Sequence, residues 1–252
     1  FYYSSYDKPE GSELSAKTDQ HKLYYHKLGT SQSEDILIYG GTPEEKHRYV
    51  GASVTEDGRY LFISASKTTS GNVAFLKDLS QENSPLRPVD KSYSTDSYLL
   101  EALGDQLFIV TNSNAPNQKV ITVNAKRPEE KNWKDFIPET EHVLSPGSGG
   151  GYFFARYIVD VITQVVQYNA KGDNMGTIEL PGIGTARGWN GTKEEETLYY
   201  SFTNYHSPGV LYSYDPKTKT SELYWKPEID FNPDDYVSEQ VFYTSADGTQ
   251  VP

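Results

Sequence analysis

The chain has 252 residues, with 23 Lys and Arg against 35 Asp and Glu, and a formal net charge of −12. This charge repels phosphate backbones and anionic lipids, so neither nucleic acid nor a membrane is expected as a partner. The absence of cysteine excludes a disulfide, a thiolate zinc site and a thiol nucleophile. Thirteen per cent of the residues are aromatic, including 21 Tyr, which favours a folded, strand-rich protein over a disordered one.

The sequence carries little information about the compartment of the protein. No apolar run approaches the roughly 20 residues that a membrane helix needs, and no signal peptide is visible. We therefore expect a soluble chain, either cytoplasmic or periplasmic, and the sequence does not resolve which of the two.

The first predicted elements are two short strands separated by a polar stretch. Phe1–Tyr6 looks like the middle of a strand, and the residues "DKPEGSELSAKTDQH" then predict a long loop. A clearer unit follows from Tyr49. The strand "YVGASVT" leads through a turn at Glu56-Asp57-Gly58 to "RYLFISAS", and the loop "KTTSGN" leads to a third strand, "VAFLKDL". A weaker fourth strand closes this unit.

The same unit recurs along the chain. Five predicted second strands can be superimposed, and their steps are 58, 47, 45 and 46 residues: Tyr2–Ser5, Tyr60–Ile63, Leu107–Val110, Tyr152–Ala155 and Leu198–Ser201. Five predicted third strands follow with steps of 51, 46, 45 and 45 residues: Leu23–Tyr25, Ala74–Leu76, Val120–Thr122, Val165–Gln167 and Val210–Tyr212. Four antiparallel strands in 40 to 50 residues, without helical periodicity, are typical of a β-propeller blade.

Both ends of the chain raise a question about this all-β array. Five blades are visible, and the first lacks its opening strand. Residues 227–240 are acidic and rich in turns, which predicts a connector, and "VFYTSA" then predicts a strand with a turn at Asp247-Gly248-Thr249 and no second strand. Two interpretations remain open at this point. Either "VFYTSA" completes the first blade of a closed five-bladed ring, or it enters a further domain beyond a larger ring.

Motifs for chemistry are scarce. There is no G-x-S-x-G nucleophile motif, and the glycine-rich run Gly147–Gly151 is interpreted as a flexible connection. The five histidines show no metal-ligand spacing, so no metal and no cofactor is predicted. His206-Ser207-Pro208-Gly209 is interpreted as a turn. Glu101 is the one carboxylate in the pattern that a sugar-cleaving propeller would need, and one carboxylate does not make such a site.

Four segments resemble one particular family: "HKLYYHKLGTSQSEDILIY", "EDGRYLFIS", "FTNYHSPGVLYSYD" and "VFYTSADGTQVP". They are similar to the seven-bladed propeller of the prolyl oligopeptidases, serine peptidases that cleave short peptides on the carboxyl side of proline. The resemblance implies that residues 1–240 are blades three to seven and that residues 241–252 are the first strand and turn of a following α/β-hydrolase domain. The family's Ser, His and Asp would lie after Pro252, so no catalytic residue is expected in this chain, and the chain alone should be inactive.

The resemblance also implies which residues line the substrate cavity and which partners to expect. Tyr2 matches an aromatic residue that lines the cavity, and Asn72-Val73 falls where some members carry an arginine that holds the peptide backbone. Since Val73 cannot donate a side-chain hydrogen bond, that contact is in doubt here. The implied partners are short proline-containing peptides and the hydrolase domain of the same polypeptide. The alternative interpretation is a self-contained five-bladed propeller that acts as a glycosidase or an interaction scaffold.

Overall fold

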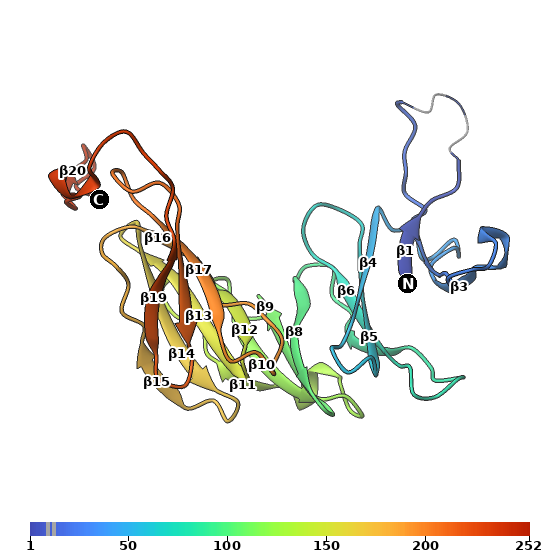
Figure 1. Cartoon of the computed structure of the whole chain (residues 1–252). Coiled ribbons are helices and arrows are strands. Elements are labelled where there is room, and N and C mark those ends of the chain that lie inside the picture. Colours follow the sequence, from blue (N-terminus) through green and yellow to red (C-terminus); the bar gives the residue numbers. More distant parts are fainter. Residues whose placement is uncertain (9–10, 12–13) are drawn as a thin grey trace. The chain divides into compact units, whose positions relative to one another are not determined.

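The computed structural model describes residues 1–8, 11 and 14–252, and its strands form antiparallel meanders (Figure 1). The chain divides into two compact units, 1–138 and 139–252, which are described separately. The only helices in the described residues are three short 3-10 turns, which are η1 (Gln32–Glu34), η2 (Glu130–Asn132) and η3 (Pro233–Asp235). No helix in the described part of the chain is long and apolar enough to cross a membrane.

The first unit holds three sheets, in each of which consecutive strands pair in chain order. Sheet 1 consists of β1 (Tyr2–Ser5), β2 (Lys22–Tyr25) and β3 (Ile36–Tyr39). Sheet 2 consists of β4 (Tyr49–Val54), β5 (Tyr60–Ser66), β6 (Val73–Asp78) and β7 (Arg87–Asp90). Sheet 3 consists of β8 (Ser97–Leu103), β9 (Gln106–Thr111), β10 (Lys119–Asn124) and β11 (Lys134–Ile137).

The second unit holds two further four-stranded sheets and a hairpin. Sheet 4 consists of β12 (Ser145–Gly149), β13 (Tyr152–Val159), β14 (Ile162–Asn169) and β15 (Asn174–Thr177). Sheet 5 consists of β16 (Thr185–Gly188), β17 (Leu198–Thr203), β18 (Val210–Asp215) and β19 (Thr220–Trp225). The hairpin pairs β20 (Tyr243–Thr244) with β21 (Gln250–Val251).

The repeat predicted from the sequence is confirmed strand by strand. The first series falls on β1, β5, β9, β13 and β17, and the second on β2, β6, β10, β14 and β18. Each sheet contains one strand of each series, and these two strands are neighbours. Sheet 1 has three strands and lacks the opening strand, as expected. The connection between β1 and β2 contains no strand in its described residues, and its residues 9, 10, 12 and 13 lie outside the described part.

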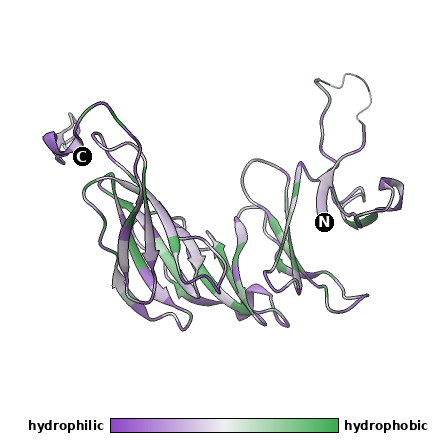
Figure 2. Ribbon diagram, viewed as in Figure 1, coloured by the Kyte–Doolittle hydropathy of each residue, from purple (hydrophilic) through white to green (hydrophobic). Residues whose placement is uncertain are grey.

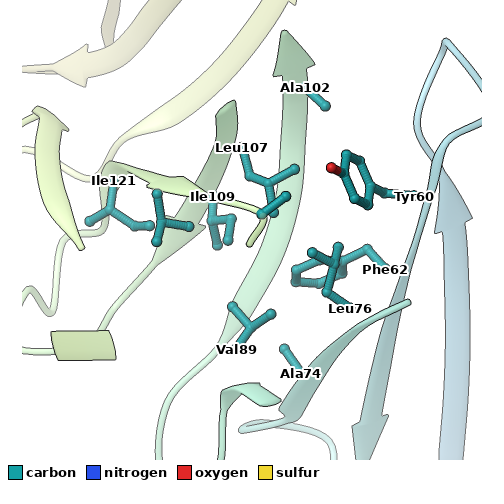
Figure 3. Close-up of a cluster of buried hydrophobic side chains, with 11 residues drawn as sticks. Tyr60, Phe62, Ala74, Leu76, Val89, Ala102, Leu107, Ile109 and Ile121 are labelled. Atoms are coloured by element: carbon teal, nitrogen blue, oxygen red, sulfur yellow. The ribbon is translucent and has the colours of Figure 1, made fainter. Parts of the chain in front are cut away.

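Apolar cores lie between successive sheets of a unit, and the middle strand β5 buries both of its faces. In β5, Tyr60 and Phe62 belong to the cluster shared with sheet 3, whereas Leu61 and Ile63 belong to the cluster shared with sheet 1. Figure 3 shows Tyr60, Phe62 and Leu76 meeting Leu107 and Ile109. Figure 2 shows the hydrophobic segments along the strands and the hydrophilic ones mainly in the connections. Successive sheets packed face to face are the arrangement expected for propeller blades.

The glycine-rich run was interpreted wrongly as a flexible connection. Ser145–Gly149 is strand β12, and it pairs with β13 along its whole length, so that only Gly150 and Gly151 form a turn. A Cβ atom on Gly149 would lie 2.8 Å from the backbone nitrogen of Gly191. Glycine is therefore needed because sheet 5 approaches the backbone of β12 too closely for a side chain.

The last 26 residues of the chain, 227–252, consist of a connector followed by a short hairpin. Residues 227–240 contain no strand and only η3, as expected of a connector. The prediction of a missing second strand after Asp247-Gly248-Thr249 is wrong, because Gln250 and Val251 pair with Thr244 and Tyr243. A hairpin needs only the two residue pairs that the chain supplies here.

Candidate functional site

Asn72 holds two sheets of the first unit together. Its side-chain Oδ1 accepts a hydrogen bond from the Ser97 amide at 2.9 Å, and its Nδ2 donates one to the Ser97 carbonyl at 2.9 Å. The residue is 6% exposed and precedes β6 of sheet 2, whereas Ser97 begins β8 of sheet 3. The carboxamide is thus committed to the backbone of the neighbouring sheet. The adjacent Val73 is 5% exposed and belongs to the core between sheets 1 and 2.

The connection that precedes Asn72 is also fixed closely. The Gly71 amide donates to a carboxylate oxygen of Asp96 at 2.8 Å. Gly71 has a φ of +76°, and a Cβ atom there would lie 1.8 Å from the Tyr93 carbonyl oxygen. Only glycine allows both the left-handed backbone and this approach. The connection 67–72 is therefore seated on the segment that joins sheets 2 and 3.

Tyr2 lies in sheet 1, in surroundings different from those of Asn72. It pairs with Tyr25 across β1 and β2, and the two ring centroids are 5.1 Å apart. The ring packs against the core between sheets 1 and 2 while part of it stays accessible. Burial, and then the neighbouring Tyr25, raise the pKa of Tyr2. Its hydroxyl therefore stays protonated at neutral pH and can donate a hydrogen bond.

The nearest approach to a catalytic array in the described residues is an imidazole–carboxylate pair. His26 Nδ1 lies 2.7 Å from Asp35 Oδ1, and the hydroxyl of Tyr3 donates to Asp35 Oδ2 at 2.6 Å. The phenol of Tyr3, followed by His26, lowers the pKa of Asp35 against the opposing effect of burial. A serine triad would need a hydroxyl on the other imidazole nitrogen, whereas the ring of Phe1 packs against His26 at a centroid distance of 4.9 Å.

A second histidine lies near a serine without completing a triad. Ser4 Oγ and His21 Nδ1 are 3.4 Å apart, which is too long for a strong hydrogen bond. The imidazole ring of His21 is stacked on the ring of Tyr6. Burial lowers the pKa of His21, so the ring is neutral at pH 7. The pairs His26–Asp35 and Ser4–His21 are therefore separate contacts.

The remaining predicted residues have local roles. His206 lies in the connection between β17 and β18, where its amide donates to Asn204 Oδ1 at 3.2 Å, in agreement with the predicted turn. Glu101 lies at a register shift in β8, and its Oε1 accepts from the Ala102 amide at 2.8 Å. Among the residues that the structure describes, no group of three or more His, Cys, Asp or Glu side chains is arranged to hold a metal ion.

A cavity of about 640 Å³ in the second unit was missed by sequence reasoning. It lies at the end of sheets 4 and 5 where each second strand connects to the third, and its lining includes Val161, Ile183, Tyr205 and residues 238–241. The side chain of Gln240 donates from Nε2 to the carbonyl oxygen of Asp160. Tyr205 is fully exposed and Val161 is 63% exposed. The connector thus runs beside an apolar surface, which isolated apolar residues in turns are too weak a signal to predict.

Four-stranded antiparallel sheets with apolar cores between successive sheets place the chain in the class of β-propeller proteins. The model of the family "Prolyl oligopeptidase, N-terminal beta-propeller domain" matches residues 1–227, and the chain belongs to this family. The chain is 48% identical over 253 residues to the prolyl endopeptidase of Elizabethkingia meningoseptica, covering all of this chain and 36% of that protein. It is 30% identical over 264 residues to the dual function macrocyclase-peptidase POPB of Galerina marginata, again covering all of this chain and 36% of the relative.

Solved structures agree with this assignment. A prolyl endopeptidase from a study of inter-domain dynamics in catalysis and specificity matches with a TM-score of 0.83 and 29% identity, over 99% of this chain and 37% of that one. Prolyl oligopeptidase B from Galerina marginata matches with a TM-score of 0.84 and 27% identity, over 99% of this chain and 36% of that one. The chain therefore spans about a third of the length of these relatives, and the propeller model accounts for its residues 1–227.

Proposed function

We propose that this chain is the substrate-selecting propeller portion of a serine peptidase that hydrolyses short peptides on the carboxyl side of proline. The observation that carries the proposal is the 48% identity, over the whole chain, to a prolyl endopeptidase. In this proposal residues 1–240 are five blades of the ring, and residues 241–252 begin an α/β-hydrolase domain of the same polypeptide. The reactive Ser, His and Asp belong to that domain.

The division of labour follows from what the blades contain. Their apolar side chains pack into cores between successive sheets, and titratable groups form local clamps such as His26–Asp35. Such blades are suited to shielding a reaction site and to excluding large substrates. In the hydrolase domain an activated serine attacks the peptide carbonyl, a histidine accepts and returns the proton, and an aspartate orients the histidine.

Two residues of this chain are proposed to shape the cavity. The partly accessible ring of Tyr2 lines it, and Asn72 contributes by holding the ends of sheets 2 and 3 together. Because Val73 stands beside Asn72, no guanidinium holds the peptide backbone at this position. Either another side chain makes this contact, or the peptide is bound more loosely there than it would be in a relative with arginine.

The apolar surface beside the connector supports the placement of a further domain. Val161, Tyr205 and Val241 expose large apolar side chains around the 640 Å³ cavity, next to the segment that leads to residues 241–252. Contiguous exposed apolar groups mark contact surfaces. We assign this surface in the second unit to contact with the hydrolase domain.

The length of the native polypeptide tests the proposed domain arrangement. The 253 aligned residues make up 36% of the Elizabethkingia relative, which is therefore about 700 residues long. We expect an intact mass corresponding to about 700 residues, with a G-x-S-x-G sequence after Pro252. A native product of 28.4 kDa would exclude the proposed arrangement.

A further inference from the structure

One cavity in the first unit is lined by basic side chains. Its volume is about 570 Å³, and its lining comes from three connections: residues 15–19 between β1 and β2, then Pro43, Glu44, Lys46 and Arg48 between β3 and β4, and Lys67 after β5. The lining cations are Lys17, Lys46, Arg48 and Lys67, which we call the basic pocket. All three connections leave the same end of sheets 1 and 2, so the topology brings together charges that are up to 50 residues apart.

The charge of the basic pocket contrasts with that of the whole chain. Four cations face two lining carboxylates, Asp19 and Glu44, which leaves a formal excess of two positive charges (4 − 2) in a chain whose net charge is −12. In the described part of the chain, none of the four cations has a carboxylate oxygen within 4.0 Å. Arg48 and Lys67 lie over the rings of Tyr49 and Tyr93, at 5.9 and 4.3 Å from the ring centroids. Cations that line a cavity without a carboxylate partner attract an anionic group.

Buried contacts next to the basic pocket hold the residues that line it. His47, between Lys46 and Arg48, is 1% exposed, and its Nε2 lies 2.7 Å from the hydroxyl of Tyr93. The His47 carbonyl accepts from the His21 amide at 3.0 Å. The ammonium of Lys67 lies 4.3 Å above the centre of the Tyr93 ring. The backbone that carries Lys46 and Arg48, and the side chain of Lys67, are therefore held in place before a ligand arrives, which lowers the entropic cost of binding.

We propose that the basic pocket binds the carboxylates of short acidic peptides. An arginine fork and three lysine ammonium groups match carboxylates, and about 570 Å³ is enough for two or three acidic side chains or a peptide terminus. The formal excess of positive charge in the basic pocket attracts the carboxylates of such peptides. The choice of a peptide as the ligand rests on the proposed function, and it makes acidic peptides the favoured substrate class.

Binding by the chain itself tests this proposal without any catalysis. The probe is the peptide Glu-Glu-Glu, with Gln-Gln-Gln as the uncharged control and inorganic phosphate as a competing anion, each titrated by calorimetry. We expect Glu-Glu-Glu to bind, Gln-Gln-Gln not to bind, and affinity to fall as salt rises because accessible charges are screened. The double variant Lys46→Gln/Arg48→Gln should weaken binding of Glu-Glu-Glu at least tenfold.

The matched control removes the same number of charges elsewhere. Lys27→Gln/Lys171→Gln changes two exposed lysines outside the basic pocket and should leave the affinity within twofold. Equal losses in both double variants would show a general charge effect and overturn the site. Absence of Glu-Glu-Glu binding would also overturn it, as would binding of phosphate alone.

Hydrolysis by the complete polypeptide then separates this proposal from the proposed function. The substrates are Ala-Gly-Pro-Ala-Glu-Glu and Ala-Gly-Pro-Ala-Gln-Gln, compared by kcat/KM. We expect the ratio of acidic to neutral substrate to fall at least fivefold in Lys46→Gln/Arg48→Gln and to stay constant in the control. Failure to cleave either peptide contradicts the proposed function, whereas cleavage with an unchanged ratio contradicts the acidic preference alone.

Discussion

The carboxamide of Asn72 makes two hydrogen bonds of 2.9 Å to the amide and carbonyl of Ser97, across the junction between sheets 2 and 3. Replacing Asn72 with alanine leaves both backbone groups buried without these partners. We expect Asn72→Ala to lower the free energy of unfolding by about 1–3 kcal/mol, measured in urea. Asn83→Ala, at an exposed position in the β6–β7 connection, is the control and should change it by less than about 0.5 kcal/mol.

Close packing against β12 gives a second prediction. A Cβ atom on Gly149 would lie 2.8 Å from both the Gly191 nitrogen and a methyl carbon of Leu198. Because a backbone atom cannot move aside cheaply, Gly149→Ala should lower the free energy of unfolding by about 1–3 kcal/mol. Gly182→Ala, where a Cβ atom would meet nothing within 4 Å, should have little effect. Similar losses in both variants would contradict the steric explanation.

Asp105 gives a prediction about pH. Lys126, the hydroxyl of Tyr60 and Arg59 lower its pKa to about 2, against the opposing effect of burial. Because the folded pKa is depressed, the stabilisation is present above the usual aspartate pKa of about 3.9 and is lost as pH falls towards 2. The difference in unfolding free energy between the native chain and Asp105→Asn should therefore shrink from pH 5 to pH 2. A constant difference over this range would contradict the assignment, and Asp230→Asn serves as the exposed control.

The turn between β13 and β14 is strained. Asp160 and Val161 have φ values of +47° and +62°, although a β-branched residue rarely adopts the left-handed region. Glycine is favoured in such a two-residue turn, so Val161→Gly should raise the free energy of unfolding by about 0.5–1 kcal/mol. Val143→Gly, at an exposed valine without a positive φ, should not stabilise the chain. Destabilisation by Val161→Gly would show that its side chain makes contacts that outweigh the strain.

Much of the fold could be predicted from local pattern. Runs such as Tyr60–Ile63 and Leu107–Val110 are apolar at successive positions because both faces of these strands are buried, and in β5 sheet 1 covers one face and sheet 3 the other. Strand β12 could not be predicted this way, since Gly147 and Gly149 carry no side chain, and the close approach of Asn190 and Gly191 that requires glycine there comes from a distant part of the sequence. Local pattern reports a residue's own side chain and not the backbone that comes to lie beside it.

Strand register and the candidate sites also depend on distant residues. The sequence superimposes Leu23 on Ala74 and Tyr2 on Tyr60. In the structure Leu23 pairs with Ser4 and Ala74 pairs with Ser64, so Ser4 corresponds to Ser64 and Tyr2 corresponds to Phe62, two residues away from Tyr60. The partner of Asn72 lies 25 residues further along the chain. The basic pocket gathers isolated cations from three connections, which no single motif reveals.

The most direct test of the central claim is hydrolysis of one short proline peptide by two samples, this 252-residue chain and the complete polypeptide that contains it. We predict cleavage after proline by the complete polypeptide and no detectable cleavage by the chain alone, because the reactive groups belong to the hydrolase domain. Turnover by the chain alone, or its absence from the complete polypeptide, would contradict the account.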